Sequence, residues 1–215
     1  MKRIKVEQGT IEWHETRYGK IGGSTSKGLF VKSDTLMLDL LSQHLEDYEP
    51  EDGFLSAAME RGNDLEPDAI RLLSDYTGID FKSEGWLQCE EVPLLGISPD
   101  AITDCDEYSA EVKCPGRKKH TETIVNDVIP ADYLHQCIHY FTVNPKLKKH
   151  YFASFRPENK LKPLFVKEMT RDTVVDLGTK RKPSLATVAE WSEIARTNAI
   201  EIQKQIDANI NKLEF

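Results

Sequence analysis

The chain has 215 residues, of which 39% are hydrophobic and 30% are charged, and this composition is typical of a globular protein in water. The length supports one domain with a sizeable core and is short of two, so we expect a single domain over residues 1–215. With 28 Lys and Arg against 36 Asp and Glu, the net charge of −8 excludes a broadly basic surface. Any contact with nucleic acid must therefore depend on local basic clusters.

Signals for membranes, secretion and structural zinc are missing from the sequence. No run approaches eighteen apolar residues, and the first residues lack the apolar core of a signal peptide, so we expect a cytoplasmic protein without membrane contact. The four cysteines are irregularly spaced and include no Cys-x-x-Cys pair: Cys89, Cys105, Cys114 and Cys137. This spacing predicts free thiols, with neither a zinc knuckle nor a disulfide framework.

The first predicted element is a helix within residues 7–17, which continues through residues 18–24 into a turn with two glycines. Gly22 and Gly23 precede Ser24 at a helix start, so backbone N–H groups and hydroxyls face a common point. Arg17 lies seven positions before Ser24 and can supply a guanidinium to the same point. The pattern fits a pocket for a terminal phosphate; the alternative is a helix capped by Ser24 or Ser26 with Arg17 on the surface.

Two further helices are predicted before the centre of the chain. Residues 34–46 form an amphipathic helix, the acidic residues 46–52 an exposed linker, and residues 54–76 a longer helix or helix pair whose apolar stripe includes Met59. Glu66 on this second helix either faces inward, toward a metal or its water shell, or is a solvated carboxylate. Residues 77–80 end the helix, and residues 81–91 supply a strand.

The most informative stretch is a predicted β-hairpin formed by residues 95–102 and 110–115. Because side chains two apart on a strand share a face, Glu111 and Lys113 point the same way, and Asp100 from the neighbouring strand can meet them. Two carboxylates suit Mg²⁺ or Mn²⁺, and an adjacent lysine can orient or deprotonate a water and stabilise transition-state charge. The alternative is an ordinary surface hairpin, but Pro99 beside Asp100 at a strand end favours a site.

Basic and polar side chains follow the hairpin. Arg117, Lys118 and Lys119 form either a phosphate-binding cluster or a solvated loop. A helix is predicted over residues 132–144, and its Gln136 lies beside the apolar stripe, where an amide can hold an attacking water or a phosphate oxygen. His135 and His139 have the spacing of a helical zinc pair, but the sequence supplies no third ligand beside them, so a zinc site is not favoured.

The last third of the chain supplies two strands and a helix. Residues 149–156 and 163–169 are predicted strands that complete the sheet. A final helix is predicted over residues 184–213, and Thr187 with Glu190 has the spacing of a capping box near its start. Its apolar stripe packs on the body of the protein or on another subunit. The sequence contains no Gly-x-x-x-x-Gly-Lys phosphate loop.

Together, these motifs resemble the phage lambda exonuclease family of YqaJ-type viral recombinases, within the PD-(D/E)xK nuclease superfamily. The resemblance covers roughly residues 8–155 and depends on five short motifs in a fixed order. They are Trp13, His14 and Arg17; Ile21 to Ser24; Arg61, Gly62 and Glu66; Gly96 to Asp100 with Glu111 to Lys113; and His135 with Gln136. The fold it implies is α/β (α+β), with a restriction-endonuclease-like core of a mixed sheet flanked by helices, and an extra C-terminal helix.

The resemblance also assigns roles to residues. Asp100, Glu111 and the main-chain carbonyl of Val112 would hold Mg²⁺ or Mn²⁺, and Glu66 would complete a second metal site or its water shell, giving two ions. Lys113 would help to activate the nucleophile, and Gln136 would orient it. Arg17 and Ser24 would bind a 5′-phosphate. The residues expected to contact DNA are Trp13, Met59, Arg117 and Lys119, of which the basic pair matches the family only loosely.

The implied activity is degradation of one strand of duplex DNA from its 5′ end, which releases mononucleotides and leaves a 3′ overhang. The resemblance further implies a homotrimeric ring around DNA and cooperation with a single-strand annealing recombinase. Within the single domain, residues 8–50 would form the phosphate-binding part, 54–170 the nuclease core, and 184–213 the C-terminal helix. Two alternatives remain open: a structure-specific or restriction-type endonuclease with the same site, and a non-catalytic DNA-binding module.

Overall fold

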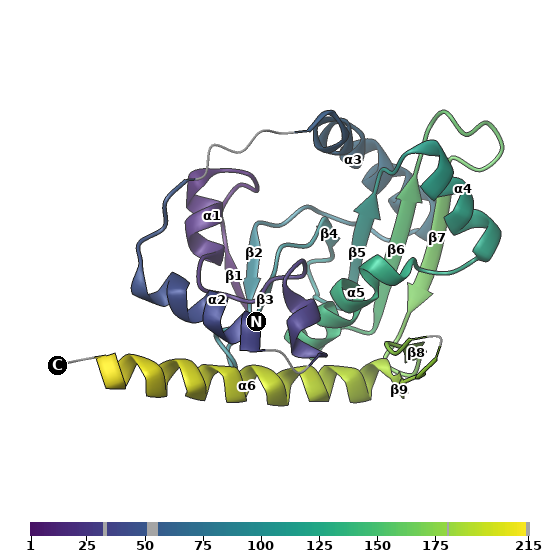
Figure 1. Ribbon diagram of the computed structural model, residues 1–215. Coiled ribbons are helices and arrows are strands. Elements are labelled where there is room, and N and C mark those ends of the chain that lie inside the picture. The colour runs from purple at the N-terminus through teal and green to yellow at the C-terminus, as the bar shows by residue number, and fades with distance from the viewer. Residues whose placement is uncertain (32–33, 51–55, 180, 214–215) are drawn as a thin grey trace.

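A computed structural model describes residues 1–31, 34–50, 56–179 and 181–213 (Figure 1). The strands are β1 (Lys2–Ile4), β2 (Trp86–Gln88), β3 (Gly96–Ile97), β4 (Ala101–Ile102), β5 (Tyr108–Lys113), β6 (Lys149–Phe155), β7 (Leu164–Met169), β8 (Val174–Asp176) and β9 (Leu185–Thr187). The helices are α1 (Ile11–Arg17), the 3-10 helix η1 (Ser26–Leu29), α2 (Asp34–Leu45), α3 (Ala57–Thr77), α4 (Arg117–Asn126), α5 (Ala131–Val143) and α6 (Val188–Leu213).

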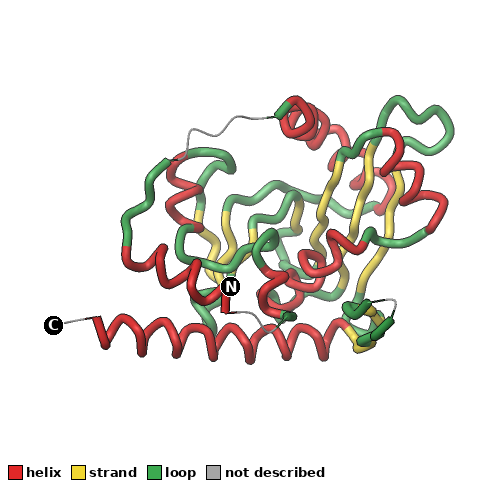
Figure 2. Tube along the Cα trace, viewed as in Figure 1, coloured by secondary structure: helices red, strands yellow, loops and turns green. Residues whose placement is uncertain are grey.

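The central sheet has the strand order β4-β5-β6-β7 and is mixed, because β5 and β6 are parallel and the other two pairs are antiparallel. Alternation along β5 sends Ala110 and Val112 to the side where Ala69 and Leu73 of α3 pack. The other face carries Phe152 and packs into the larger core cluster with α5. Helices therefore cover both faces of the sheet, as Figure 2 shows in red and yellow.

The stretch expected to be one strand over residues 95–102 is two short strands in different sheets. β3 pairs with β2 in the three-stranded sheet β1-β2-β3, whereas β4 pairs with β5. Pro99 lies between them and has no N–H to donate to a ladder, which explains why the pairing changes there. The hairpin of β4 and β5 is present as predicted, and Asp100 lies directly before β4. The strand expected over residues 81–91 is confined to Trp86–Gln88.

The predicted helices are present, with local differences. α3 begins after its N-cap Ser56, whose hydroxyl accepts the N–H of Met59, and ends at Gly78 with φ +70°. Its expected start at Phe54 lies outside the described residues, as do Glu51 and Asp52 of the acidic linker. The basic residues 117–119 form the first turn of α4, so the expectation of a solvated loop there is wrong.

The C-terminal helix begins at Val188, four residues later than predicted, because Leu185–Thr187 pairs with β8 as strand β9. The predicted capping box is present: the N–H and hydroxyl of Thr187 donate to Glu190 Oε2, and the N–H of Glu190 donates to Thr187 Oγ1. α6 runs beneath the molecule in Figure 1 and contacts α5, α2 and η1, so its apolar stripe packs on the body of its own chain. The buried stripe residues are Val188, Trp191, Ala195, Ala199, Ile202 and Ile206.

The structure also bears on the cysteines and on membrane spans. Cys89, Cys105, Cys114 and Cys137 are all free thiols, as predicted. Among the described residues, no helix combines the length and the apolar character needed to cross a bilayer.

Candidate active site

The carboxylates of Asp100 and Glu111 converge on the ammonium of Lys113 at the carboxyl end of β5. Alternation places Glu111 and Lys113 on one face of the strand, and Lys113 Nζ donates to Glu111 Oε1. Lys113 Nζ lies 3.9 Å from Asp100 Oδ2, which also accepts the N–H of Val112 at 2.6 Å. This backbone bond fixes Asp100 against β5, so the three groups meet as the sequence predicts.

Glu111 is fully buried, and both of its oxygens are hydrogen-bonded. Gln136 Nε2 donates to Oε1 at 2.6 Å, and the hydroxyl of Tyr140 donates to Oε2 at 2.7 Å. Gln136 and Tyr140 are four residues apart on α5, so they lie on the same helix face. Gln136 was expected at this site from the sequence, whereas Tyr140 was not, because it lies on the buried face of α5 like an ordinary core residue. Hydrogen bonds to a buried carboxylate orient it strongly.

The charges of this cluster depend on one another. Burial raises the pKa of Asp100 well above its ordinary value, and the nearby Glu111 raises it further, while Lys113 opposes the shift. Burial lowers the pKa of Lys113, but the carboxylates of Glu111 and Asp100 outweigh burial and leave that pKa above its usual value. Lys113 is therefore an ammonium at neutral pH. An ammonium can orient a water and stabilise negative charge, which are among the roles expected for Lys113.

Glu66 reaches the same region from α3. Its side chain is half-buried, and burial raises its pKa, with Lys113 lowering and Glu111 raising it in turn. A cavity of about 370 Å³ lies here between α3 and β5. It is lined by Ala58, Met59, Gly62, Asn63, Glu66, Val112, Lys113, Cys114, Pro115 and Tyr133. The inward orientation expected for Glu66 is thus the one observed.

The donor set suits a hard divalent cation. Asp100 and Glu111 supply oxygen atoms only, and the Lys113 ammonium balances part of their negative charge. Across the described ranges, no group of three or more His, Cys, Asp or Glu side chains is arranged to hold a metal ion. The expected three-acid set that includes Glu66 is thus not assembled in this structure.

The second predicted site lies between α1, the glycine turn and α2. The Arg17 guanidinium lies 3.9 Å from the centroid of the Trp13 ring and 5.9 Å from that of Trp86. Burial lowers the pKa of Arg17, and among the described residues no carboxylate pairs with it. A cavity of about 490 Å³ opens beside it. The lining residues are His14, Arg17, Tyr18, Lys20, Gly22, Thr25, Leu36, Asp39, Leu40, Ser42 and Gln43.

Two hydroxyl residues lie in the glycine turn, Ser24 and Thr25. Ser24 is exposed and does not line the cavity, whereas Thr25 does. The N–H of Gly22 donates to Thr25 Oγ1 at 3.0 Å, and this bond closes the turn. The alternative of a helix capped by Ser24 or Ser26 is wrong, because η1 has Thr25 as its N-cap residue and no side-chain capping bond. Lys20, half-buried in the same cavity, was also missed; burial lowers its pKa.

Helix α5 joins the two regions. A Cβ added at Gly23 would lie 2.9 Å from Gln136 Cγ, so the turn packs directly on the side chain that bonds Glu111. His139 Nε2 lies 3.2 Å from the carbonyl oxygen of Ile21 and 3.0 Å from that of Gly96. One buried imidazole therefore bridges the start of the glycine turn and the strand that leads to Asp100.

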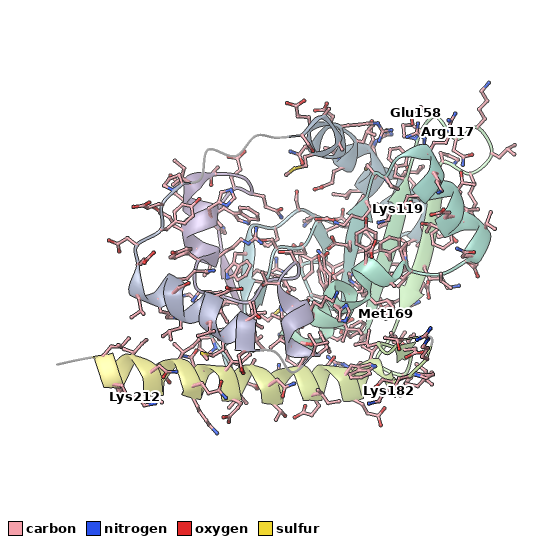
Figure 3. The ribbon with its side chains drawn as sticks, in the orientation of Figure 1. Arg117, Lys119, Glu158, Met169, Lys182 and Lys212 are labelled. Carbon is pink, nitrogen blue, oxygen red and sulfur yellow. The ribbon has the colours of Figure 1, made fainter. Side chains whose placement is uncertain are left out.

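The residues expected to contact DNA lie in different environments. Trp13 Nε1 donates to Ser98 Oγ at 2.8 Å, so this ring is partly structural. Met59 is 55% exposed beside the cavity at Glu66. Figure 3 labels Arg117 and Lys119 on α4; Arg117 is exposed, while Lys119 donates to Asp132 at 2.8 Å.

Comparisons with known proteins agree with this geometry. The sequence model of the YqaJ-like viral recombinase domain matches residues 12–146. The crystal structure of LHK-Exo in complex with dAMP matches with a TM-score of 0.71 and 25% identity, over 95% of this chain and 98% of that chain. The alkaline exonuclease LHK-Exo from Laribacter hongkongensis gives 0.71 and 24%, with the same coverage. A search of curated proteins found no match.

A third solved structure, a phage-related exonuclease from Haemophilus somnus, is 16% identical with a TM-score of 0.60, over 92% of this chain and 97% of that chain. At this identity the likeness concerns the fold. The match to the alkaline exonuclease structures confirms the predicted class, a mixed sheet flanked by helices.

Proposed function

The chain belongs to the YqaJ-like viral recombinase family, and from this membership and the site geometry we propose that it is a metal-dependent 5′→3′ exonuclease of duplex DNA. The observation that carries the proposal is the pairing of two differently built sites. Asp100, Glu111 and Lys113 form a dense charge cluster, and Arg17 lies in a cavity without a carboxylate partner among the described residues. The likeness to alkaline exonuclease structures supports nuclease chemistry at the cluster.

The cation proposed for the cluster is Mg²⁺, with Mn²⁺ as a substitute, held by Asp100, Glu111 and the carbonyl of Val112. When bound, it polarises the scissile phosphate and activates a water. Tyr140 and Gln136 hold the Glu111 carboxylate in one orientation, and the Lys113 ammonium stabilises negative charge that develops on the phosphate. Glu66 is proposed to bind the water shell or a second ion from the α3 side.

The preference for chain ends is assigned to the Arg17 pocket. A guanidinium stacked on Trp13, with backbone N–H groups and Thr25 nearby, offers charge-assisted hydrogen bonds to a terminal phosphate. Only a strand end carries such a group, and each cleavage produces a new one that can enter the same pocket. The expected products are 5′-mononucleotides and a duplex with a 3′ overhang; the matched complex of LHK-Exo with dAMP supports a mononucleotide product.

The assembly proposed is a homotrimeric ring that encloses the duplex and cooperates with a single-strand annealing recombinase. A closed ring would keep a protein of net charge −8 on DNA, because topology supplements a modest electrostatic attraction. Within this proposal, residues 1–215 act as one nuclease domain.

Digestion of three substrates tests the function: a linear duplex with 5′-phosphate ends, one with 5′-hydroxyl ends, and a covalently closed circle, each with and without Mg²⁺. We expect mononucleotides from the phosphorylated duplex in Mg²⁺, slower digestion of the hydroxyl duplex, and an intact circle. Cleavage of the circle would indicate the endonuclease alternative. Binding of duplex without any hydrolysis, in either Mg²⁺ or Mn²⁺, would indicate the non-catalytic module.

A further inference from the structure

A carboxylate lies between two arginines just beyond the catalytic lysine, in the loop that joins β6 and β7. Arg61 Nη2 donates to both oxygens of Glu158 at 2.9 Å, and Arg156 Nε lies 3.7 Å from Glu158 Oε2. Two guanidiniums therefore face one carboxylate, which leaves the group with a net positive charge.

Both arginines are held in place by the backbone that follows Lys113. Arg61 Nη1 donates to the carbonyl of Cys114 at 3.1 Å, and Arg156 Nη1 donates to that of Pro115 at 3.4 Å. Arg61 and Arg156 side chains are 31% and 20% exposed, whereas Glu158 is 53% exposed. The two cations are thus fixed in the protein surface, and the anion is the most exposed member of the group and the one that a ligand can replace.

The surroundings add more positive charge at this position. Helix α4 starts two residues after Pro115 without a side-chain cap, and its first turn contains Arg117, Lys118 and Lys119 and no acidic residue. Basic side chains at a helix N-terminus oppose the helix dipole, so this arrangement favours an external anion. Figure 3 shows Glu158 and Arg117 at the same end of the sheet, and Figure 1 places this end across β5 from α1.

We propose that Arg61 and Arg156 form a second phosphate-binding site, which takes a backbone phosphate of the duplex beyond the cleavage point and is occupied by the Glu158 carboxylate in the free protein. The inference rests on the proposed function, because it requires DNA at the cluster. It differs from the Arg17 pocket in its ligand, an internal diester phosphate, and in its position on the opposite side of β5. A phosphate offers two anionic oxygens, as a carboxylate does, so it can replace Glu158 without rearranging the guanidiniums.

Duplex binding without divalent metal tests the site, measured by fluorescence anisotropy over a range of salt concentrations. Glu158→Gln removes the competing charge and keeps the size of the side chain. Because exposed ion pairs contribute little, we expect duplex binding about two- to fivefold tighter than in the wild type. The ratio of digestion rates for 5′-phosphate and 5′-hydroxyl ends should stay unchanged, since the Arg17 pocket is untouched.

Glu168→Gln is the matched control, because Glu168 is also 53% exposed and pairs with one lysine, Lys149, at 2.8 Å toward the other end of β6. This variant should bind duplex like the wild type, which separates a local site from a general effect of net charge. The double variant with Arg156→Gln and Glu158→Gln should no longer bind duplex more tightly than the wild type. Its plot of log affinity against log salt concentration should be less steep by about 0.9, the value for one phosphate contact. Thermal unfolding checks that the double variant is folded.

The proposal of a second site would be overturned if Glu158→Gln and Glu168→Gln bound duplex with equal affinity, or if Glu158→Gln bound it more weakly than the wild type. If the wild type digests phosphorylated duplex while these two variants behave alike, only this inference fails. If the wild type neither binds nor digests duplex, the proposed function fails and the second site fails with it.

Discussion

Two charged groups of this protein are compensated to different extents. At the carboxyl end of β5, Asp100, Glu111 and Lys113 are balanced by one another and by donors from Gln136 and Tyr140. In the cavity beside α1, Arg17 stacks on Trp13 and has no acidic partner among the described residues. The first group is organised by the chain itself, and the second leaves room for the terminal phosphate proposed above.

The difference has a thermodynamic consequence. A buried guanidinium without a counterion destabilises the folded protein, and contact with an aromatic face offsets only part of that cost. Folds retain such a group when a ligand supplies the missing charge. Removing charge from the cluster should therefore damage catalysis, whereas removing Arg17 should damage recognition of the strand end and leave stability intact.

The largest effect is expected for Asp100→Asn. The amide oxygen can still accept the N–H of Val112, so the fold is kept, but one anionic oxygen is lost from the proposed cation site. Loss of this charge should lower the rate of hydrolysis by roughly a thousandfold or more. Single-turnover digestion of phosphorylated duplex in Mg²⁺ measures it. A rate within tenfold of the wild type would remove Asp100 from the proposed chemistry.

Because the pKa of Asp100 is raised by burial and by Glu111, the same variant also relieves a repulsion in the folded state. We therefore expect Asp100→Asn to be at least as stable as the wild type in chemical denaturation without metal. A large loss of stability would mean that its inactivity reports unfolding rather than chemistry.

The next effect in size is the loss of end recognition in Arg17→Met. A charge-assisted hydrogen bond of about 1.5–3 kcal/mol corresponds to roughly a ten- to hundredfold faster digestion of 5′-phosphate than 5′-hydroxyl ends in the wild type. The variant should digest both at similar rates. Unfolding by denaturant should show unchanged or slightly increased stability, because a half-buried charge that has no acidic partner among the described residues is gone.

Arg171→Met is the control for this prediction. Burial lowers the pKa of Arg171, as it does for Arg17, but Arg171 Nη2 donates to the carbonyls of Phe141, Asn144 and Pro145. Its removal takes a donor from each of these carbonyls, although that of Asn144 keeps the N–H of Leu147, and should destabilise the protein by about 2 kcal/mol without changing end preference. If Arg17→Met lost as much stability as Arg171→Met, Arg17 would be a structural residue.

A third effect concerns His139, which joins the two regions. Burial lowers its pKa to about 4, against an ordinary value of 6.5, and hydrogen bonds to the carbonyls of Gly96 and Ile21 only partly oppose the shift. As the pH falls below 6.5, the unfolded chain binds a proton that the folded protein does not. Stability is therefore lost between pH 6.5 and 4, and this group alone should contribute a loss of about 2 kcal/mol by pH 5.

The variant His139→Gln isolates this contribution, because the raised pKa of Asp100 acts with the opposite sign in both proteins. The free energy of unfolding is measured with denaturant at pH 7 and at pH 5. The amount by which it is larger in the wild type than in the variant should be about 2 kcal/mol smaller at pH 5. A difference that does not change with pH would show that His139 is not a neutral buried base.

Local sequence pattern predicts some features of the two sites and not others. Glu111 and Lys113 were found because the two-residue period of a strand puts them on one face, and the turn residues marked the Arg17 pocket. The division of residues 95–102 was missed, because the partner of each strand is set by contacts distant in sequence. Thr25, which lines the pocket, was not expected from the sequence beside Ser24, because the course of a turn decides which neighbouring hydroxyl borders a cavity. Such details depend on packing rather than on local pattern.

Tyr140 shows the same limit and provides the smallest predicted effect. Its side chain is fully buried in the core, so its position along α5 looks like an ordinary apolar position in the sequence. Its hydroxyl nevertheless donates to Glu111 Oε2 at 2.7 Å. Tyr140→Phe keeps the ring and removes a hydrogen bond to a charged group, which should lower the rate of hydrolysis about tenfold. Tyr151→Phe is the control, because that ring packs on Phe81 across the opposite face of the sheet and should not change the rate. Equal rates in the two variants would show that Gln136 and Lys113 orient Glu111 without help from the Tyr140 hydroxyl.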